Sequence, residues 1–332
     1  MSSEIQQKNK AIVMSGTRTT GPLHVGHYFG WLTNCLKLQN EYECFFGVMD
    51  WHGMTSAYKS SDQIKNWNKD IFAEIIAWGL DPARNTIYIQ SKVPEVLELN
   101  MILANLTPMG WLERVPTWKD AEEEAKASDT HNLGRFAYPV LQASDIAIFS
   151  GSLVPVGGDQ VAHLELTREI IRRFNFIYKG KLPEPKALLT ETPSIPGLDG
   201  RKMSKSYNNG LLLTEDEKTI KKKVNSMVTK RMHREDVGVP TDCSVYAFHK
   251  LYSSNADLEW VVQGCTTAGI GCGDCKAKLC ANIEEKTKIP REKKKELLNN
   301  TKALDSIIDQ GTEKARTVAQ KNLNQIKDWM KL

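Results

Sequence analysis

The sequence has no uninterrupted apolar run close to the ~20 residues that a membrane-spanning helix needs. Its N-terminus, MSSEIQQKNK, is polar and lacks the apolar stretch of a secretory signal. It also has no internal repeat and no low-complexity tract. With 41% hydrophobic and 25% charged residues, the composition excludes a disordered chain. We therefore expect a globular cytoplasmic protein without a membrane partner, and its 332 residues, at about 150 per domain, suggest two domains.

Net charge is small, +4 at pH 7, but it is unevenly distributed. Residues 211–332 contain 22 Lys and Arg against 17 Asp and Glu, whereas residues 1–210 contain 22 against 23. A basic C-terminal third favours a polyanionic partner such as nucleic acid, although a solvated helical surface explains the same charge.

Cysteines are few and odd in number. Seven of them in a chain without a secretory signal argue against a disulfide framework. Cys35 and Cys44 stand apart and are expected to be buried apolar residues. The other five crowd into 38 residues: Cys243, Cys265, Cys272, Cys275 and Cys280. This crowding indicates a chemical role.

Short apolar segments alternate with helical periodicity in the N-terminal half. Strands are expected at 11–15, 44–49, 86–90 and 153–156, and helices at 28–38, 62–80, 138–149 and 160–174. The alternation predicts an α/β fold with a doubly wound, Rossmann-type parallel sheet. The polar segment 105–133 interrupts it, and the prolines of 183–196 indicate a long loop. Beyond Leu213, everything except the cysteine segment is expected to form a C-terminal α-helical domain.

The pattern His24-Val-Gly-His27 follows the first expected strand, at the sheet edge where such folds bind ligands. N–H groups at a helix start attract phosphate, and two imidazoles three residues apart can donate to phosphate oxygens. Gly26 leaves room for a nucleotide to approach closely. Alone, this pattern often arises by chance.

A second pattern, Lys202-Met-Ser-Lys-Ser206, lies on a loop flanked by Gly and Pro. Two lysines on such a loop can close over a triphosphate and stabilise charge that develops on the transferred phosphate. A solvated basic loop is the alternative for this pattern taken alone.

Together, in this order, the two patterns resemble the HIGH and KMSKS signatures of class I aminoacyl-tRNA synthetases. Further segments make the chain similar to the tryptophanyl-tRNA synthetase family from about Ile12 to Trp329. These segments are Met49-Asp-Trp-His52, Tyr138-Pro-Val-Leu-Gln-Ala-Ser-Asp145, Pro155-Val-Gly-Gly-Asp-Gln-x-x-His-x-Glu-Leu-Thr-Arg168 and Glu313-Lys-Ala-Arg316.

The resemblance implies an activity. L-tryptophan would attack the α-phosphate of ATP, expel pyrophosphate and form tryptophanyl-AMP, whose acyl group then passes to tRNA(Trp). It implies a catalytic domain over residues 1–207, whose insert at about 105–133 contributes to a homodimer, and a helical anticodon-binding domain over 208–332. ATP and Mg²⁺, the latter bound mainly by the phosphates, are the implied cofactors.

The resemblance also implies site residues. The transition-state contacts would be His24, His27, Lys202 and Lys205. The ATP contacts would be Arg18, Thr19, Thr20, Gly26, His27, Gly157, Gly158, Asp159, Lys202, Met203, Ser204, Lys205 and Ser206. Because indole offers one N–H donor and flat apolar faces, its site needs one acceptor and apolar walls. The tryptophan contacts would be Asp145 as that acceptor, Tyr138 and Gln160 at the α-amino group, and Gln142, Met14, His52, Val154 and Val156 around them.

Arg18 and Gln142 are shared with a thermophile-like branch of the family that carries a [4Fe–4S] cluster on C-x22-C-x6-C-x2-C. The metal ligands implied here are Cys243, Cys265, Cys272 and Cys275, with spacing C-x21-C-x6-C-x2-C, and Cys280 is left over. Four thiolates suit an iron–sulfur cluster or tetrahedral Zn²⁺, and free reduced cysteines are the third interpretation.

Three alternatives share part of the pattern. A tyrosyl-tRNA synthetase differs in the amino acid it activates, and Gln142 keeps this alternative open. A small adenylyltransferase has HxGH but lacks the helical domain and the Lys202 loop. A non-catalytic, synthetase-like RNA-binding paralogue usually loses a catalytic histidine or lysine, and all four are present here.

Overall fold

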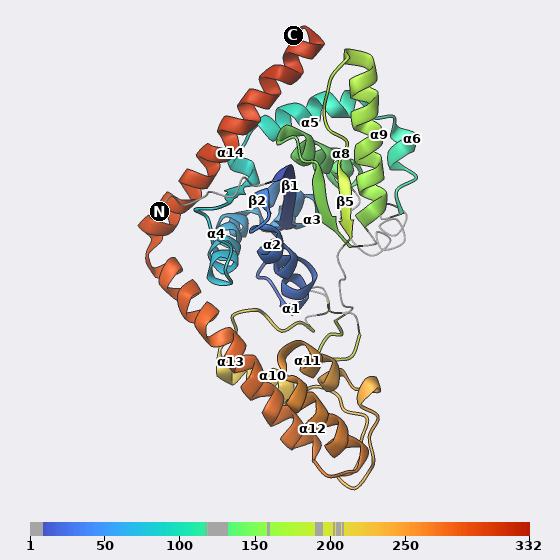
Figure 1. The fold of residues 1–332 in the computed structure, drawn as a ribbon, viewed down its shortest axis with the longest axis vertical. Coiled ribbons are helices and arrows are strands. Elements are labelled where there is room, and N and C mark those ends of the chain that lie inside the picture. The colour runs from blue at the N-terminus through green and yellow to red at the C-terminus, as the bar shows by residue number, and fades with distance from the viewer. Residues whose placement is uncertain are drawn as a thin grey trace. The chain divides into compact units, whose positions relative to one another are not determined.

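The computed structural model describes residues 9–116, 118, 132–157, 160–189, 195–201, 203, 207 and 209–332. The chain divides into two compact units, whose elements are labelled in Figure 1. The first unit comprises Met1–Pro22, Leu32–Glu191 and Asn300–Leu332, and the second comprises Leu23–Trp31 and Thr192–Asn299.

A parallel sheet in the order β3-β2-β1-β4-β5 forms the centre of the first unit. Its strands are β1 (Asn9–Arg18), β2 (Tyr42–Met49), β3 (Thr86–Ile89), β4 (Leu153–Val156) and β5 (Lys186–Leu189). The order reverses between β1 and β4, which makes the carboxyl ends of these strands the switch point where doubly wound folds bind ligands. The predicted Rossmann-type sheet is confirmed.

Helices cover both faces of this sheet (Figure 1), in keeping with an inner strand, β2, that is apolar on both sides. In β2, every residue from Cys44 to Met49 is buried. The helices and turns of the first unit are α2 (Thr33–Leu38), α3 (Asp50–Ala57), η2 (Tyr58–Ser60), α4 (Ser61–Ala77), η3 (Gln90–Lys92), α5 (Glu95–Leu106), α6 (Met109–Leu112), α8 (Leu133–Ile148), α9 (Val161–Tyr178) and α14 (Thr301–Met330).

The last helix belongs to the first unit, so the two units do not divide the chain at residue 207. Along α14, Ala315, Ala319, Leu323 and Ile326 form an apolar stripe at helical spacing. These side chains are buried in the same core as those of α5 and α8. That burial attaches the C-terminal end of the chain to the sheet.

The second unit is mostly helical and carries all five clustered cysteines on or beside helices. Its elements are α1 (Val25–His27), most of the π-helical turn η1 (Tyr28–Leu32), α10 (Glu217–Asn225), η6 (Pro240–Asp242), α11 (Ser244–Tyr252), α12 (Asn255–Thr266) and α13 (Cys272–Asn299). Within the described part of the chain, no helix is both long and apolar enough to cross a membrane.

Three sequence predictions of secondary structure are wrong. Residues 226–239, predicted to be helical, lie between α10 and η6 and form turns and irregular structure. The segment 183–196, predicted to be a loop, contains the edge strand β5, whose four residues pair with β4 although most of them are exposed. The cysteine segment, predicted to be non-helical, includes the end of α12 and the start of α13. Gly271 and Gly273 lie before and within the first turn of α13 and do not prevent this helix from starting at Cys272.

At Gly311, α14 packs directly against the backbone of β3. An added Cβ would lie 1.9 Å from the carbonyl oxygen of Ile87, a backbone atom that cannot swing away. The clash in Gly311→Ala should therefore outweigh the ~1 kcal/mol gain in helix propensity, and the free energy of unfolding should fall by about 1–3 kcal/mol. Urea unfolding followed by circular dichroism measures this. The exposed neighbour Gln310→Ala is the control, and equal stability of the two variants would contradict this packing.

Candidate active site

A buried carboxylate on α8 is held by two neighbouring elements. Asp145 is 2% exposed, and both of its oxygens have partners. Oδ2 lies 2.7 Å from His52 Nε2 on α3, and Oδ1 accepts a 2.7 Å hydrogen bond from Gln90 Nε2. Because a buried anion is costly unless it is hydrogen-bonded, these contacts stabilise Asp145 as an acceptor inside the protein. The structure brings together the predicted Asp145 and His52 and adds Gln90.

A second polar chain joins the predicted residues Tyr138 and Gln160 through a buried histidine. Tyr138 Oη lies 2.5 Å from His163 Nε2, and His163 Nδ1 lies 2.9 Å from Gln160 Oε1. An amide oxygen only accepts, so in this arrangement His163 carries its proton on Nδ1, and Nε2 accepts the Tyr138 hydroxyl proton. The Tyr138 oxygen then presents lone pairs, which suit an ammonium group.

The predicted apolar contacts lie on the strands that flank the switch point. Met14 on β1 and Val154 and Val156 on β4 are buried in the core of the first unit. Gln142 on α8 is partly exposed. Their contact with a substrate stays a prediction.

Where β1 ends, two predicted nucleotide contacts differ in their surroundings. Arg18 donates a 2.7 Å hydrogen bond to Ser56 Oγ, and burial, with a smaller effect of the nearby charge of Arg135, lowers the pKa of Arg18. Thr19 is fully buried and donates to Asn68 Oδ1 at 3.0 Å, so its side chain is committed to the interior.

Two further predicted contacts, Thr20 and Gly157, are partly exposed at the ends of β1 and β4. The next two residues of the predicted phosphate segment, Gly158 and Asp159, lie outside the described residues.

The HxGH turn is built from its own two imidazoles. His24 Nδ1 accepts from the Gly26 backbone N–H at 3.1 Å, and His27 Nδ1 accepts from the His24 backbone N–H at 3.1 Å. With Nδ1 as acceptor, each neutral ring carries its proton on Nε2, as a donor suited to phosphate. An added Cβ at Gly26 would lie 2.8 Å from the His24 ring, so glycine permits this packing.

This turn pairs with the segment that follows the KMSKS pattern. His24 and Leu212 form an antiparallel bridge, flanked by hydrogen bonds from Val25 N to Leu211 O at 2.9 Å and from Leu213 N to Leu23 O at 3.1 Å. The two signature patterns, far apart in sequence, therefore belong to one compact unit.

Described residues before and after the KMSKS pattern are hydrogen-bonded to one another, and we call this closed base of the loop the neck. Leu198 N donates to Asn209 O at 2.8 Å, and Gly197 N donates to Arg201 O at 2.6 Å. Asp199 accepts from Asn209 Nδ2 at 2.8 Å and from the backbone and guanidinium of Arg201, and the Asn209 amide contributes most to lowering the pKa of Asp199. We call this arrangement the Asp199 clamp.

Within the pattern itself, Met203 is buried, whereas Lys202, Ser204, Lys205 and Ser206 lie outside the part of the chain that the structure describes. Their placement as transition-state and ATP contacts stays a prediction.

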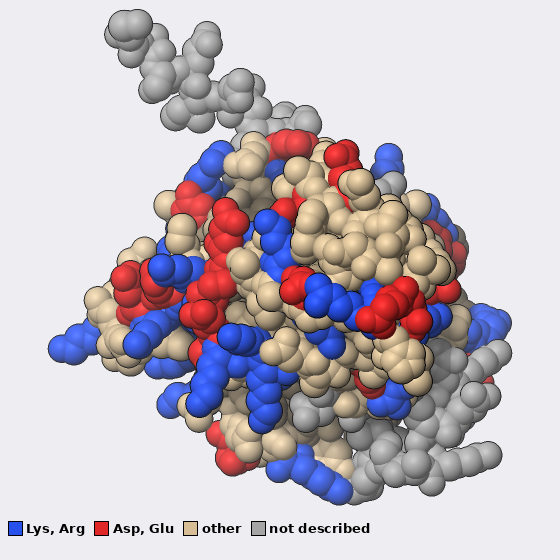
Figure 2. Space-filling view, turned by 90° about the horizontal axis from the view of Figure 1, so that it is seen from below, with Lys and Arg blue, Asp and Glu red and all other residues tan. Residues whose placement is uncertain are grey.

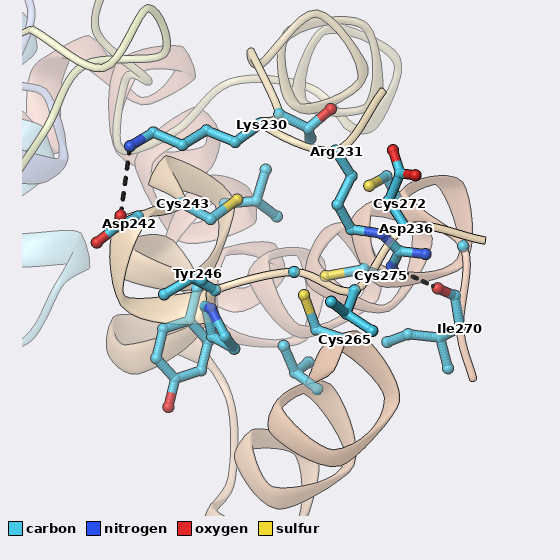
Figure 3. Close-up of a pocket in the computed structure, with 18 residues that line it drawn as sticks. Lys230, Arg231, Asp236, Asp242, Cys243, Tyr246, Cys265, Ile270, Cys272 and Cys275 are labelled. Carbon is cyan, nitrogen blue, oxygen red and sulfur yellow. Dashed lines mark hydrogen bonds and ion pairs between the residues drawn. The ribbon is translucent and has the colours of Figure 1, made fainter. Parts of the chain in front are cut away.

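The four predicted metal ligands line one cavity of about 350 Å³ in the second unit. Figure 3 shows their side chains entering it from three segments: Cys243 before α11, Cys265 on α12, and Cys272 with Cys275 on α13. Burial and the other three cysteines raise the pKa of Cys275 to about 12. Among the described residues, no three His, Cys, Asp or Glu side chains are gathered closely enough to hold a single metal ion.

Two other residues shape this cavity. Arg231 donates to Ile270 O at 2.8 Å through Nη1, while its Nε is buried and has no hydrogen-bond partner in the described structure (Figure 3). Gly238 also lines the cavity, and an added Cβ there would lie 2.4 Å from Cys265 Sγ. The cavity is thus lined by four thiols and by the unsatisfied Nε–H of Arg231, and the glycine at position 238 leaves it open beside Cys265.

Comparison with known proteins agrees with this geometry. The family model described as tRNA synthetases class I (W and Y) matches residues 6–287. This chain belongs to that family.

Relatives in the family match nearly end to end. The tryptophan--tRNA ligase of Thermotoga maritima is 42% identical over 324 residues, 96% of this chain and 99% of that protein. The tryptophan--tRNA ligase of Fusobacterium nucleatum is 38% identical, over 95% of this chain and 96% of that protein. A crystal structure of tryptophanyl-tRNA synthetase from Campylobacter jejuni, complexed with ADP and tryptophan, has a TM-score of 0.89 at 34% identity and covers 97% of this chain and 100% of that one.

For a class I tRNA synthetase, two residues of this site were missed from sequence. Gln90 follows the expected strand 86–90 at the ligand-binding edge of the sheet, which is the signal that could have indicated it. His163 lies in the family segment Pro155–Arg168. Its role as the link between Tyr138 and Gln160 depends on the fold, because Tyr138 is 25 residues away in sequence, although Gln160 is only 3 residues away.

The Asp199 clamp predicts a local effect in this synthetase. Asp199→Ala should increase the hydrogen-exchange rate of the Gly197 and Leu198 amides on the order of tenfold. The reason is that Asp199 joins Arg201 to Asn209, so without its carboxylate the two sides of the neck open more often. Hydrogen-exchange mass spectrometry measures it. Glu235→Ala removes an exposed carboxylate of the same unit as a control. Unchanged exchange in Asp199→Ala would show that the carboxylate does not close the neck.

Proposed function

We propose that this chain is a tryptophan--tRNA ligase, which activates L-tryptophan with ATP and transfers it to tRNA(Trp). The buried Asp145 carboxylate carries the proposal, because it provides a fixed acceptor for the indole N–H at the switch point of the sheet. Membership of the family and the names of the relatives support the choice of amino acid.

In the first step, a tryptophan carboxylate oxygen bonds to the α-phosphorus of ATP, and the bond to the bridging oxygen of pyrophosphate breaks. Such transfers depend on positioning and on charge stabilisation. His24 and His27 contribute Nε2–H donors. Lys202 and Lys205 are assigned to the charge that develops on the phosphates.

Substrate binding follows from the two polar chains of the site. Tyr138 and Gln160 receive the α-ammonium group, and His163 holds both of them. The assigned ATP contacts are Arg18, Thr20, Gly26, Gly157, Gly158, Asp159 and the KMSKS residues, with Mg²⁺ on the phosphates. ADP and tryptophan in the Campylobacter jejuni structure support a site for a nucleotide and an amino acid.

The tRNA partner is assigned to the second unit together with the chain up to residue 332. Exposed lysines such as Lys221, Lys222 and Lys230 lie in this part of the chain, and Figure 2 shows Lys and Arg interspersed with Asp and Glu on one face. A modest basic excess suits contact with a phosphate backbone. Residues 208–332 are accordingly proposed as the anticodon-binding region, and the cytoplasm as the compartment where tRNA is charged.

A homodimer through the first unit is part of the proposal. Met109 and Leu133 in the segment 105–133, and Met101 just before it, are between 65% and 78% exposed. A cleft of about 430 Å³ between α3, α5 and α8 lies close by and is lined largely by apolar residues such as Trp51 and Leu141. Large exposed apolar side chains in one region are typical of a protein interface.

We further propose that the four-cysteine cavity holds a [4Fe–4S] cluster, with Cys243, Cys265, Cys272 and Cys275 as ligands. Tetrahedral zinc at ~2.3 Å from each thiolate would draw the four sulfurs around one point. The cavity of about 350 Å³ that the four cysteines line is large for a single ion and suits a larger centre better. The orphaned Arg231 Nε suits an anionic group. When bound, such a cluster would cross-link the chain segments around it.

The metal proposal predicts about four irons per chain in anaerobically purified protein. Cys275→Ser should lose most of this iron, whereas Cys280→Ser, which changes a cysteine outside the cavity lining, should keep it. Elemental analysis decides between the metals. About one zinc without iron, or no metal under anaerobic conditions, would contradict the cluster.

The functional proposal predicts ATP–pyrophosphate exchange with tryptophan and not with tyrosine. Asp145→Asn should lower kcat/KM for tryptophan by about 10- to 150-fold. In this variant an NH₂ group replaces one carboxylate oxygen and faces the donor of His52 or Gln90, and no charged acceptor remains for the indole N–H. Ser144→Ala, a buried polar change one residue earlier, is the control. Exchange with tyrosine, or wild-type kcat/KM for tryptophan in Asp145→Asn, would contradict the assignment.

A further inference from the structure

Gln90 lies at the centre of the first unit and is fully buried. It begins η3 directly after β3, at the ligand-binding edge of the sheet. The reaction described above uses neither its amide nor its backbone. A fully buried amide nevertheless needs hydrogen-bond partners for its oxygen and for its NH₂ group. The residues that provide these partners are the ones that Gln90 holds in place.

The amide oxygen is occupied by the start of α3. Gln90 Oε1 accepts from the backbone N–H of Trp51 at 3.1 Å and from that of His52 at 3.4 Å. Since an NH₂ group cannot accept these bonds, the two backbone donors fix which way the amide faces. The NH₂ group of Gln90 must therefore point away from α3.

In that orientation the NH₂ group meets Asp145. Gln90 Nε2 donates to Asp145 Oδ1 at 2.7 Å, while His52 Nε2 lies 2.7 Å from Oδ2. Each carboxylate oxygen has two lone-pair sites, so each keeps one site for another donor. With a donor on each oxygen, the plane of the carboxylate is fixed from both sides, and His52 is itself fixed by Gln90 through its backbone.

Tyr88, two residues before Gln90, offers a contrast. It is fully buried, and its pKa is raised by burial and by the charge of Asp145. Its hydroxyl has no hydrogen-bond partner in the described structure. Proximity to Asp145 thus does not by itself create a contact with the carboxylate, which makes Tyr88 a matched control.

We propose, on the basis of the proposed tryptophan activity, that Gln90 is a positioning residue for specificity: it holds the Asp145 carboxylate turned to accept the indole N–H. Gln90 touches no substrate in this role. Through Asp145, Gln90 would favour tryptophan over an isostere that lacks the indole N–H, because only the hydrogen bond from that N–H depends on how the carboxylate is oriented.

The test compares two substrates in ATP–pyrophosphate exchange: tryptophan and β-(benzothiophen-3-yl)alanine, in which sulfur replaces the indole N–H. Gln90→Met removes the donor with little change in side-chain length. We expect the tryptophan-to-analogue ratio of kcat/KM to fall by about 10- to 100-fold, with kcat/KM for the analogue near its wild-type value. Tyr88→Phe should leave the ratio unchanged.

A second variant separates positioning from support of the fold. Gln90→Glu keeps an oxygen for the Trp51 and His52 N–H groups, but its other oxygen donates to Asp145 only when protonated. Its ratio should lie between those of wild type and Gln90→Met. An equal loss for both substrates in both variants, or a wild-type ratio in either, would overturn the inference. If wild-type protein activates tyrosine in place of tryptophan, the proposed function itself fails.

Discussion

The site depends on one constraint, a carboxylate that is buried inside the protein and must be hydrogen-bonded there. Burying Asp145 would be costly without donors, and the chain supplies them from α3 and from the end of β3. Those donors are in turn fixed, because the Gln90 oxygen binds the first turn of α3. The sheet order places β3, β2 and β1 side by side, so the ends of these strands and the helix that follows β2 can support one buried group.

The histidines and lysines proposed to contact phosphate belong to a different unit from the residues around Asp145. The HxGH turn pairs with residues 211–213 and belongs to the same compact unit as the KMSKS neck, while Asp145 and Tyr138 belong to the other unit. The residues proposed for amino-acid recognition are therefore held by the packed interior of the sheet unit. Those proposed for phosphate contacts are next to backbone pairing and the Asp199 clamp.

Much of the fold follows from sequence, because apolar periodicity and strand–helix alternation are local. The alternation indicated β1 to β4, and the HxGH pattern indicated the ligand edge. Tertiary contacts decided the rest. Edge strand β5 is only four residues long, is mostly exposed and lies among prolines, so its short apolar run did not indicate a strand. Helix α14 joins the sheet unit through a stripe whose partners in α5 and α8 lie more than 150 residues earlier. The role of Gln90 was hidden because its partners, His52 and Asp145, are 38 and 55 residues away.

A crystal structure with tryptophan bound tests the central claim most directly, because it measures the distance from the indole nitrogen to the Asp145 carboxylate. We expect a hydrogen bond of about 2.7–3.2 Å to one carboxylate oxygen, with the contacts to His52 and Gln90 retained. An indole nitrogen bound to another group, or a carboxylate turned away from Gln90 when tryptophan is present, would contradict it.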